Sequence, residues 1–108
     1  MPAEISATDL AARLDGPDAD AMLLLDVREQ WEWDLARIDG ARLIPMNRIP
    51  LHLSELPDDR ALVVICHHGV RSYQVALFLE HNGFENVLSL QGGIEDWART
   101  VDPSIARY

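Results

Sequence analysis

The feature that most constrains this chain is the alternation of short, unbroken apolar runs with helix-like segments. The clearest runs are MLLLD, Met22–Asp26, and ALVVI, Ala61–Ile65. Continuous apolar runs of this length are typical of strands buried on both faces, as in a parallel sheet covered by helices. Because strands and helices alternate, we predict right-handed crossovers and an α/β fold with a mostly parallel sheet.

The remaining segments complete a coarse map of the chain. We expect two more strands, over residues 41–44 and 87–90, and helices over residues 6–14, 29–35, 47–56, 71–82 and 94–99. Ser6, with Asp9 three residues later, has the pattern of a helix N-cap, and Gly83 suits the left-handed residue that follows a helix. Residues 15–20 predict a loop, and residues 100–108 an irregular tail on the surface.

Composition limits the partners and the location of the protein. The chain has 108 residues, a length typical of one domain, which we place over residues 1–108. A net charge of -9 argues against a nucleic-acid or anionic-membrane surface. No apolar run is long enough to span a bilayer and the N-terminus shows no secretory signal, so we expect no membrane partner and a cytoplasmic protein. All nine basic residues are arginine, which excludes Schiff-base chemistry on a lysine.

The single cysteine stands at a chemically favourable position. Cys66 follows a predicted central strand and precedes a helix that we expect to begin near Arg71. At that end of a strand, the N–H groups of the turn and of the helix form a cradle for an anion. The helix end and the Arg71 cation favour the thiolate, so Cys66 is expected to be nucleophilic. Gly69 permits a positive φ in the turn, and Ser72 can donate a hydrogen bond to the sulfur.

Two other interpretations of this stretch are weaker. A lone cysteine after an apolar run is often only a small core residue, but here turn-forming and polar residues follow it and lead to a cation. His67 and His68 could suggest a metal site, but three adjacent residues cannot easily point at one ion. We therefore expect no metal and no cofactor, and assign both imidazoles to the wall of the cradle, where they tune its charge.

Three segments in this order make the chain similar to single-domain rhodaneses, a sulfurtransferase family. They are LLLDVREQWEWDLARIDGARLIP, CHHGVRS and LQGGIEDWA, and together they cover essentially the whole chain. The resemblance implies a five-stranded sheet flanked by helices on both faces. It also implies that Cys66 takes a sulfane sulfur from a donor such as thiosulfate, becomes a persulfide, and passes the sulfur to a thiophilic acceptor.

The resemblance also assigns the other site residues. His67, His68, Gly69, Val70 and Arg71 would form the cradle that binds the donor. The acceptor could be a small thiol or a sulfur-carrier protein. The closing segment GGIEDWARTVDPSIARY also resembles the end of rhodanese modules fused to adenylating enzymes of molybdopterin and thiamine sulfur transfer.

The length of the loop separates two chemistries that share this architecture. Four residues stand between Cys66 and Arg71, whereas phosphatases and arsenate reductases of related fold have one more. A tighter ring suits a single sulfur atom, and Ile65 stands where those phosphatases commonly carry histidine. Sulfur transfer is therefore preferred over a phosphatase-like enzyme. A non-catalytic interaction module is the other alternative, against which the retained Cys66 and Arg71 argue.

Some charged and aromatic residues have two open interpretations. Arg71 either attracts the sulfonate of the donor or turns inward to an acidic partner such as Asp26. Arg28 and Glu29 could shape the rim of the site. Their alternative interpretation is structural, an ion pair with Asp26 and the start of a helix. For Asp26 we favour this structural interpretation. The tryptophans Trp31, Trp33 and Trp97 are best explained by packing, with one of them a possible wall of the pocket.

Overall fold

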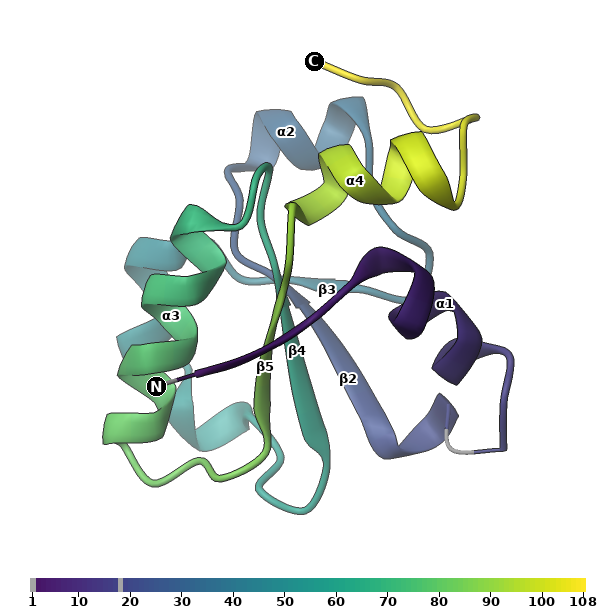
Figure 1. Cartoon of the computed structure of the whole chain (residues 1–108). Helices are drawn as coiled ribbons and strands as arrows, with labels where there is room; N and C mark the ends of the chain where they lie inside the picture. The colour runs from purple at the N-terminus through teal and green to yellow at the C-terminus, as the bar shows by residue number, and fades with distance from the viewer. Residues whose placement is uncertain (1, 18) are drawn as a thin grey trace.

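A five-stranded parallel sheet organises the protein, as the resemblance to rhodaneses implies. The computed structural model describes residues 2–17 and 19–108, and its strands follow the order β1-β5-β4-β2-β3. The strands are β1 (Ala3–Ile5), β2 (Met22–Asp26), β3 (Arg42–Leu43), β4 (Ala61–Ile65) and β5 (Val87–Leu90). The most apolar strand, β4, therefore occupies the centre of the sheet (Figure 1).

Helices cover both faces of the sheet. They are α1 (Ala7–Leu14), α2 (Gln30–Leu35), α3 (Val70–His81) and α4 (Gly93–Thr100), with short 3₁₀ segments at Ala19–Ala21, Met46–Leu51 and Leu53–Glu55. Helices α1 and α4 lie on one side, and α3 lies on the other with the 3₁₀ segments of residues 46–55 (Figure 1). None of the helices in the described part of the chain is long and apolar enough to cross a membrane.

Alternate residues of the central strand feed two separate cores. Val63 and Ile65 join Leu10 and Trp97 on the side of α1 and α4. On the other face, Leu62 and Val64 of the same strand, and Cys66 directly after it, belong to the cluster formed with α3. Successive side chains of a strand point to opposite faces, so an unbroken apolar run can fill both cores at once.

The helix boundaries confirm the predicted start and stop signals. The side chain of Ser6 accepts a hydrogen bond from the N–H of Asp9 at 3.1 Å, so Ser6 caps α1. Gly83 follows α3 with φ +94°, the left-handed conformation expected there. Asp18, in the predicted loop 15–20, lies outside the described residues, and residues 102–108 form an irregular tail.

Two expectations for local structure were wrong. The strand β1 was not predicted, and it completes the sheet by pairing with β5 through Ile5 and Leu90. Residues 47–56 were expected to form one helix but form two 3₁₀ segments instead. Pro50 lies inside the first segment, where it has no N–H to donate to a continuing α-helix.

The register of the strands brings the ends of three of them together. Asp26, the last residue of β2, lies opposite Ile65 of β4 on one side and Leu43 of β3 on the other. All strands are parallel, so the segments that follow them leave the sheet at the same edge. The residue after β4 is Cys66, and it therefore faces the polar residues that follow β2.

Candidate functional site

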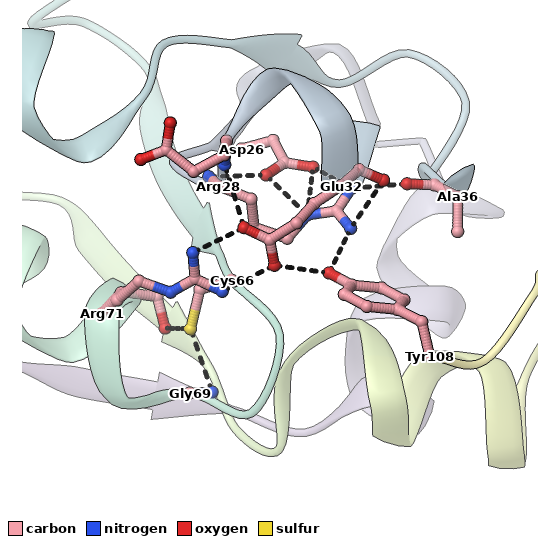
Figure 2. A network of polar contacts seen from close by, with 10 residues as sticks. Asp26, Arg28, Glu32, Ala36, Cys66, Gly69, Arg71 and Tyr108 are labelled. Atoms are coloured by element: carbon pink, nitrogen blue, oxygen red, sulfur yellow. Dashed lines mark hydrogen bonds and ion pairs between the residues drawn. The ribbon is translucent and has the colours of Figure 1, made fainter. Parts of the chain in front are cut away.

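Cys66 lies at the bottom of a tight loop between β4 and α3. Its side chain is buried, and its Sγ accepts the N–H of Gly69 at 3.0 Å (Figure 2). Gly69 has φ +104°, as predicted, and directly precedes Val70, the first residue of α3. The sulfur is therefore held by a backbone N–H at the positive end of a helix, where negative charge is stabilised.

Two buried serines form a hydrogen-bonded pair next to the sulfur. The Sγ of Cys66 lies 3.5 Å from the Oγ of Ser72, in the first turn of α3. The hydroxyls of Ser72 and Ser89 lie 2.7 Å apart, and both side chains are fully buried. With Ser89 as its second partner, the Ser72 hydroxyl can accept from the thiol or donate to the thiolate.

Arg71 turns inward, but its acidic partner is Glu32 rather than Asp26. Its Nη1 and Nη2 donate to the two carboxylate oxygens of Glu32 at 2.7 and 2.8 Å (Figure 2). Hydrogen bonds with Glu32 raise the pKa of Arg71 further above its usual range. Burial alone would raise the pKa of Glu32, but hydrogen bonds from Arg71, the Glu29 backbone and Tyr108 lower it to about 2. Both side chains are therefore charged at neutral pH.

Asp26 holds Arg28 instead, in a fully buried ion pair. The Nη2 of Arg28 lies 2.8 Å from Oδ2 of Asp26, and its Nε donates to the same carboxylate. The guanidinium also donates to the carbonyl of Ala36 at 2.6 Å. This confirms the structural interpretation of Asp26. Arg28 does not shape the rim of the site, because it is buried, and Glu29 forms the exposed N-cap of α2.

The two histidines form one wall beside the loop. The rings of His67 and His68 are stacked with centroids 3.9 Å apart, and the ring of Tyr108 stacks on His67 at the same distance. Burial, followed by the nearby His68, lowers the pKa of His67, so its imidazole is neutral at pH 7. Arg71, in contrast, is positively charged at neutral pH, and its charge interacts with Cys66.

The N-terminus of α4 fixes the other side of the loop. Ile94 donates its N–H to the carbonyl of Cys66 at 2.9 Å, and Glu95 donates to the carbonyl of His67 at 3.1 Å. A Cβ on Gly93 would lie 2.4 Å from both of these carbonyl oxygens. The glycine therefore allows the loop and α4 to approach each other closely.

The structure brings the predicted site residues together, with differences in how they face. Gly69 and Ser72 contact the sulfur of Cys66, the guanidinium of Arg71 pairs with Glu32, and the Val70 side chain is exposed to solvent. Among residues 2–17 and 19–108, no group of three or more His, Cys, Asp or Glu could hold a metal ion.

Sequence reasoning missed four residues that shape the site, Glu32, Ser89, Gly93 and Tyr108. Glu32 and Gly93 carry a signal: Glu32 stands three residues after Glu29, the spacing of a capping box at a helix start, and Gly93 belongs to the quoted LQGG segment. Ser89 is a lone polar residue in an apolar strand, a weaker signal of the same kind. For Tyr108, at the end of an irregular tail, the sequence offers none.

The three tryptophans, expected to be packing residues, differ in how far they are buried. Trp97 is buried among the residues between the sheet and α4. Trp33 is partly covered by Arg37, whose guanidinium carbon lies 5.2 Å from the ring centroid. Trp31 is exposed and meets the ring of Tyr108 edge to face, with centroids 5.8 Å apart. Trp31 is therefore a surface residue near the His67 stack.

Known proteins share the sequence pattern and the fold of this chain. The rhodanese-like domain family matches residues 6–100. A sulfurtransferase of Allochromatium vinosum is 41% identical over 103 residues, which cover 95% of this chain and 94% of that protein. A probable adenylyltransferase/sulfurtransferase MoeZ of Mycobacterium tuberculosis is 42% identical over 89 residues, 81% of this chain but 23% of that protein. A crystal structure of a rhodanese-related protein from Thermoplasma volcanium superposes with a TM-score of 0.83 at 30% identity, over 98% of this chain and 99% of that one. The chain therefore belongs to the rhodanese-like family of sulfurtransferase domains.

Proposed function

We propose that this protein moves a sulfane sulfur from thiosulfate or a persulfide donor to a thiophilic acceptor, with Cys66 as the carrier. The observation that carries the proposal is the 3.0 Å contact between Sγ of Cys66 and the N–H of Gly69, which holds the sulfur inside the loop before α3. The same loop has four residues between Cys66 and Arg71, which supports sulfur rather than phosphate as cargo.

The first half of the reaction charges the cysteine. The Cys66 thiolate attacks the outer sulfur of thiosulfate, a Sγ–S bond forms, and the S–S bond of the donor breaks. Sulfite leaves with the electron pair of the broken bond, and Cys66 becomes a persulfide. The terminal sulfur is anionic, so backbone N–H groups of residues 67–71 and the start of α3 stabilise it.

The second half restores the cysteine. A thiophilic acceptor, such as a thiol, a sulfur-carrier protein or cyanide in a laboratory assay, attacks the terminal sulfur. The Sγ–S bond breaks, and its electron pair returns to Cys66 as a thiolate. Arg71 keeps a positive charge near the cradle, where it attracts an anionic donor, while His67 and His68 line one wall of it.

The wider setting is part of the same proposal. We place the whole chain, residues 1–108, in one domain that acts in the cytoplasm, where a lone thiol stays reduced. No nucleic acid, membrane, metal or cofactor takes part. The similarity to MoeZ supports a link with adenylating enzymes as the source or destination of the sulfur.

The test is the intact mass of the protein after incubation with thiosulfate, before and after reduction. We expect a reversible gain of about 32 Da, one sulfur atom, on an activated cysteine nucleophile. The Cys66→Ser protein should show no gain. If the wild type gains no mass with thiosulfate or with a persulfide donor, the non-catalytic module becomes the better interpretation, and a phosphatase assay decides the remaining alternative.

A further inference from the structure

The tail of the chain returns to the site and places one side chain inside it. Tyr108 lies beyond residues 6–100, the part that matches the family. Its ring is stacked on His67 with centroids 3.9 Å apart and an angle of 13° between the planes. Its hydroxyl lies between Arg28 and Glu32 (Figure 2). No role for this residue follows from the loop or from the sulfur chemistry.

The Tyr108 hydroxyl joins two charged networks that otherwise lie side by side. It accepts from Nη1 of Arg28 at 2.7 Å and donates to Oε2 of Glu32 at 2.7 Å. That same Oε2 accepts from Nη2 of Arg71 at 2.8 Å. Burial raises the pKa of Tyr108 to about 12, so the hydroxyl keeps its proton and remains a donor at neutral pH.

A neighbouring ion pair fixes the position of the tail, and with it the contacts of the Tyr108 hydroxyl. Arg107 forms an ion pair with Glu95 of α4, and Glu95 donates its backbone N–H to the carbonyl of His67. Glu95 thus connects the tail and α4 to His67, the first loop residue after Cys66. Tyr108 then contacts His67 from its other side, through the ring stack.

We propose that Tyr108 is a positioning residue for the sulfur cradle, acting on Cys66 through Glu32 and Arg71. The hydroxyl orients the Glu32 carboxylate so that both of its oxygens face Arg71. The ring holds His67 at the start of the loop. Tyr108 itself does not touch Cys66 or the site of the transferred sulfur. The proposal rests on the proposed function where it concerns the sulfur donor.

The direction of the effect follows from charge. The Tyr108 hydroxyl withdraws negative charge from Oε2 of Glu32 by donating to it. Without that donor, Glu32 neutralises Arg71 more fully and is held by one contact fewer. The positive charge beside Cys66 then becomes weaker and less fixed, which lowers the thiolate fraction and the attraction for an anionic donor.

The test compares Tyr108→Phe with Ser104→Ala. The Phe variant keeps the ring stack and loses the hydroxyl, whereas Ser104 is an exposed tail residue whose hydroxyl donates to Asp102. Three experiments are made on each protein: thermal unfolding, the rate of Cys66 alkylation by iodoacetamide at pH 7, and steady-state kinetics that give KM and kcat for thiosulfate with cyanide as acceptor. Alkylation and kinetics are measured well below the unfolding temperature.

We expect Tyr108→Phe to slow alkylation and to raise KM for thiosulfate, each about threefold or more, less than the direct loss of a hydrogen bond to a charged group would give, because Tyr108 acts on Cys66 only through Glu32 and Arg71. Ser104→Ala should match the wild type. In a Glu32→Gln background, the Tyr108→Phe change should have little further effect, because the residue through which it acts is already altered.

The possible outcomes separate this inference from the proposed function. If Tyr108→Phe lowers the unfolding temperature but leaves the alkylation rate and KM unchanged, Tyr108 is only structural and the inference is overturned. An equal effect of Tyr108→Phe with and without Glu32→Gln overturns the route through Glu32. If the wild type takes up no sulfur but Tyr108→Phe still slows alkylation, the proposed function fails while the positioning role stands.

Discussion

Arg71 and Glu32 are joined by two parallel hydrogen bonds, although they are 39 positions apart and belong to different helices. Arg71 is in the first turn of α3, and Glu32 is in α2, which follows the neighbouring strand β2. The pair therefore ties together the segments that leave two adjacent strands. Through it, the charge beside Cys66 depends on a helix that contributes no atom to the loop.

The two-bond geometry predicts that lysine cannot replace Arg71. Arg71→Lys keeps the positive charge, but an ammonium group cannot make two parallel bonds to one carboxylate. We expect kcat/KM for thiosulfate to fall about tenfold or more, as measured by initial rates of thiocyanate formation. Arg42→Lys is the matched control, since Arg42 forms an exposed pair with Glu55. Equal activity of Arg71→Lys and the wild type would contradict this prediction.

The low pKa of Glu32 predicts a specific dependence of stability on pH. Lowering a pKa from 4.5 to about 2 on folding contributes about 3 kcal/mol to the free energy of unfolding. Because the folded value is the lower one, this contribution is fully present above pH 4.5 and is lost as the pH falls through 2. The glutamine side chain of Glu32→Gln does not ionise, so this pH-dependent contribution to stability is absent from that variant.

Urea unfolding of both proteins at a series of pH values tests the Glu32 prediction. The wild type should be more stable than Glu32→Gln at pH 6, and the difference should narrow steadily between pH 4.5 and pH 2. Carboxylates elsewhere titrate in both proteins, so the difference isolates Glu32. A gap between the two curves that stays constant over this range would refute the assignment.

The buried pair of Asp26 and Arg28 predicts a large loss of stability when one partner is removed. Asp26→Ala leaves a fully buried guanidinium without its carboxylate, which costs about 3–5 kcal/mol of unfolding free energy. Asp34→Ala, at an exposed position of α2, should change it by less than about 0.5 kcal/mol. Urea denaturation of the two variants measures the contrast, and similar values for both would show that the buried pair contributes little.

The sequence was sufficient for the parts of the fold that depend on local pattern. The unbroken runs of β2 and β4 predict buried strands, and the caps at Ser6 and Gly83 depend on neighbouring residues alone. The strand β1 could not be found in this way, because only Ile5 of its three residues is buried. It is defined by pairing with β5, a contact between opposite ends of the chain.

The candidate site also contains both residues that lie together because they are close in sequence and residues that only the fold brings together. Cys66, Gly69 and Ser72 are close in sequence, so a strand followed by a helix is enough to place them together. The acidic partner of Arg71 was expected to be Asp26, the last residue of β2, whereas the structure gives Glu32 of α2 that place. The choice between them depends on Arg28, which occupies Asp26 with three of its contacts and leaves Glu32 for Arg71.

The close approach of Gly93 to the loop predicts the effect of a single methyl group. Gly93 has φ +62°, and a Cβ there would lie 2.4 Å from the carbonyl oxygens of Cys66 and His67. Gly93→Ala must therefore move the loop or α4, and both hydrogen bonds from α4 to the loop depend on that spacing. We expect a loss of about 3 kcal/mol or more in unfolding free energy, a size reached when strain and lost contacts add. Sulfur uptake should fall with it.

Gly40→Ala separates this contact from backbone strain alone. Gly40 has φ +86°, but a Cβ there would meet nothing within 4 Å. Its replacement should cost only the about 1–2 kcal/mol of a left-handed non-glycine residue and leave sulfur uptake intact. Thermal unfolding and intact mass after thiosulfate treatment, on both variants, give the comparison. If Gly93→Ala is no more harmful than Gly40→Ala, then the close packing of α4 on the loop does not set the shape of the cradle.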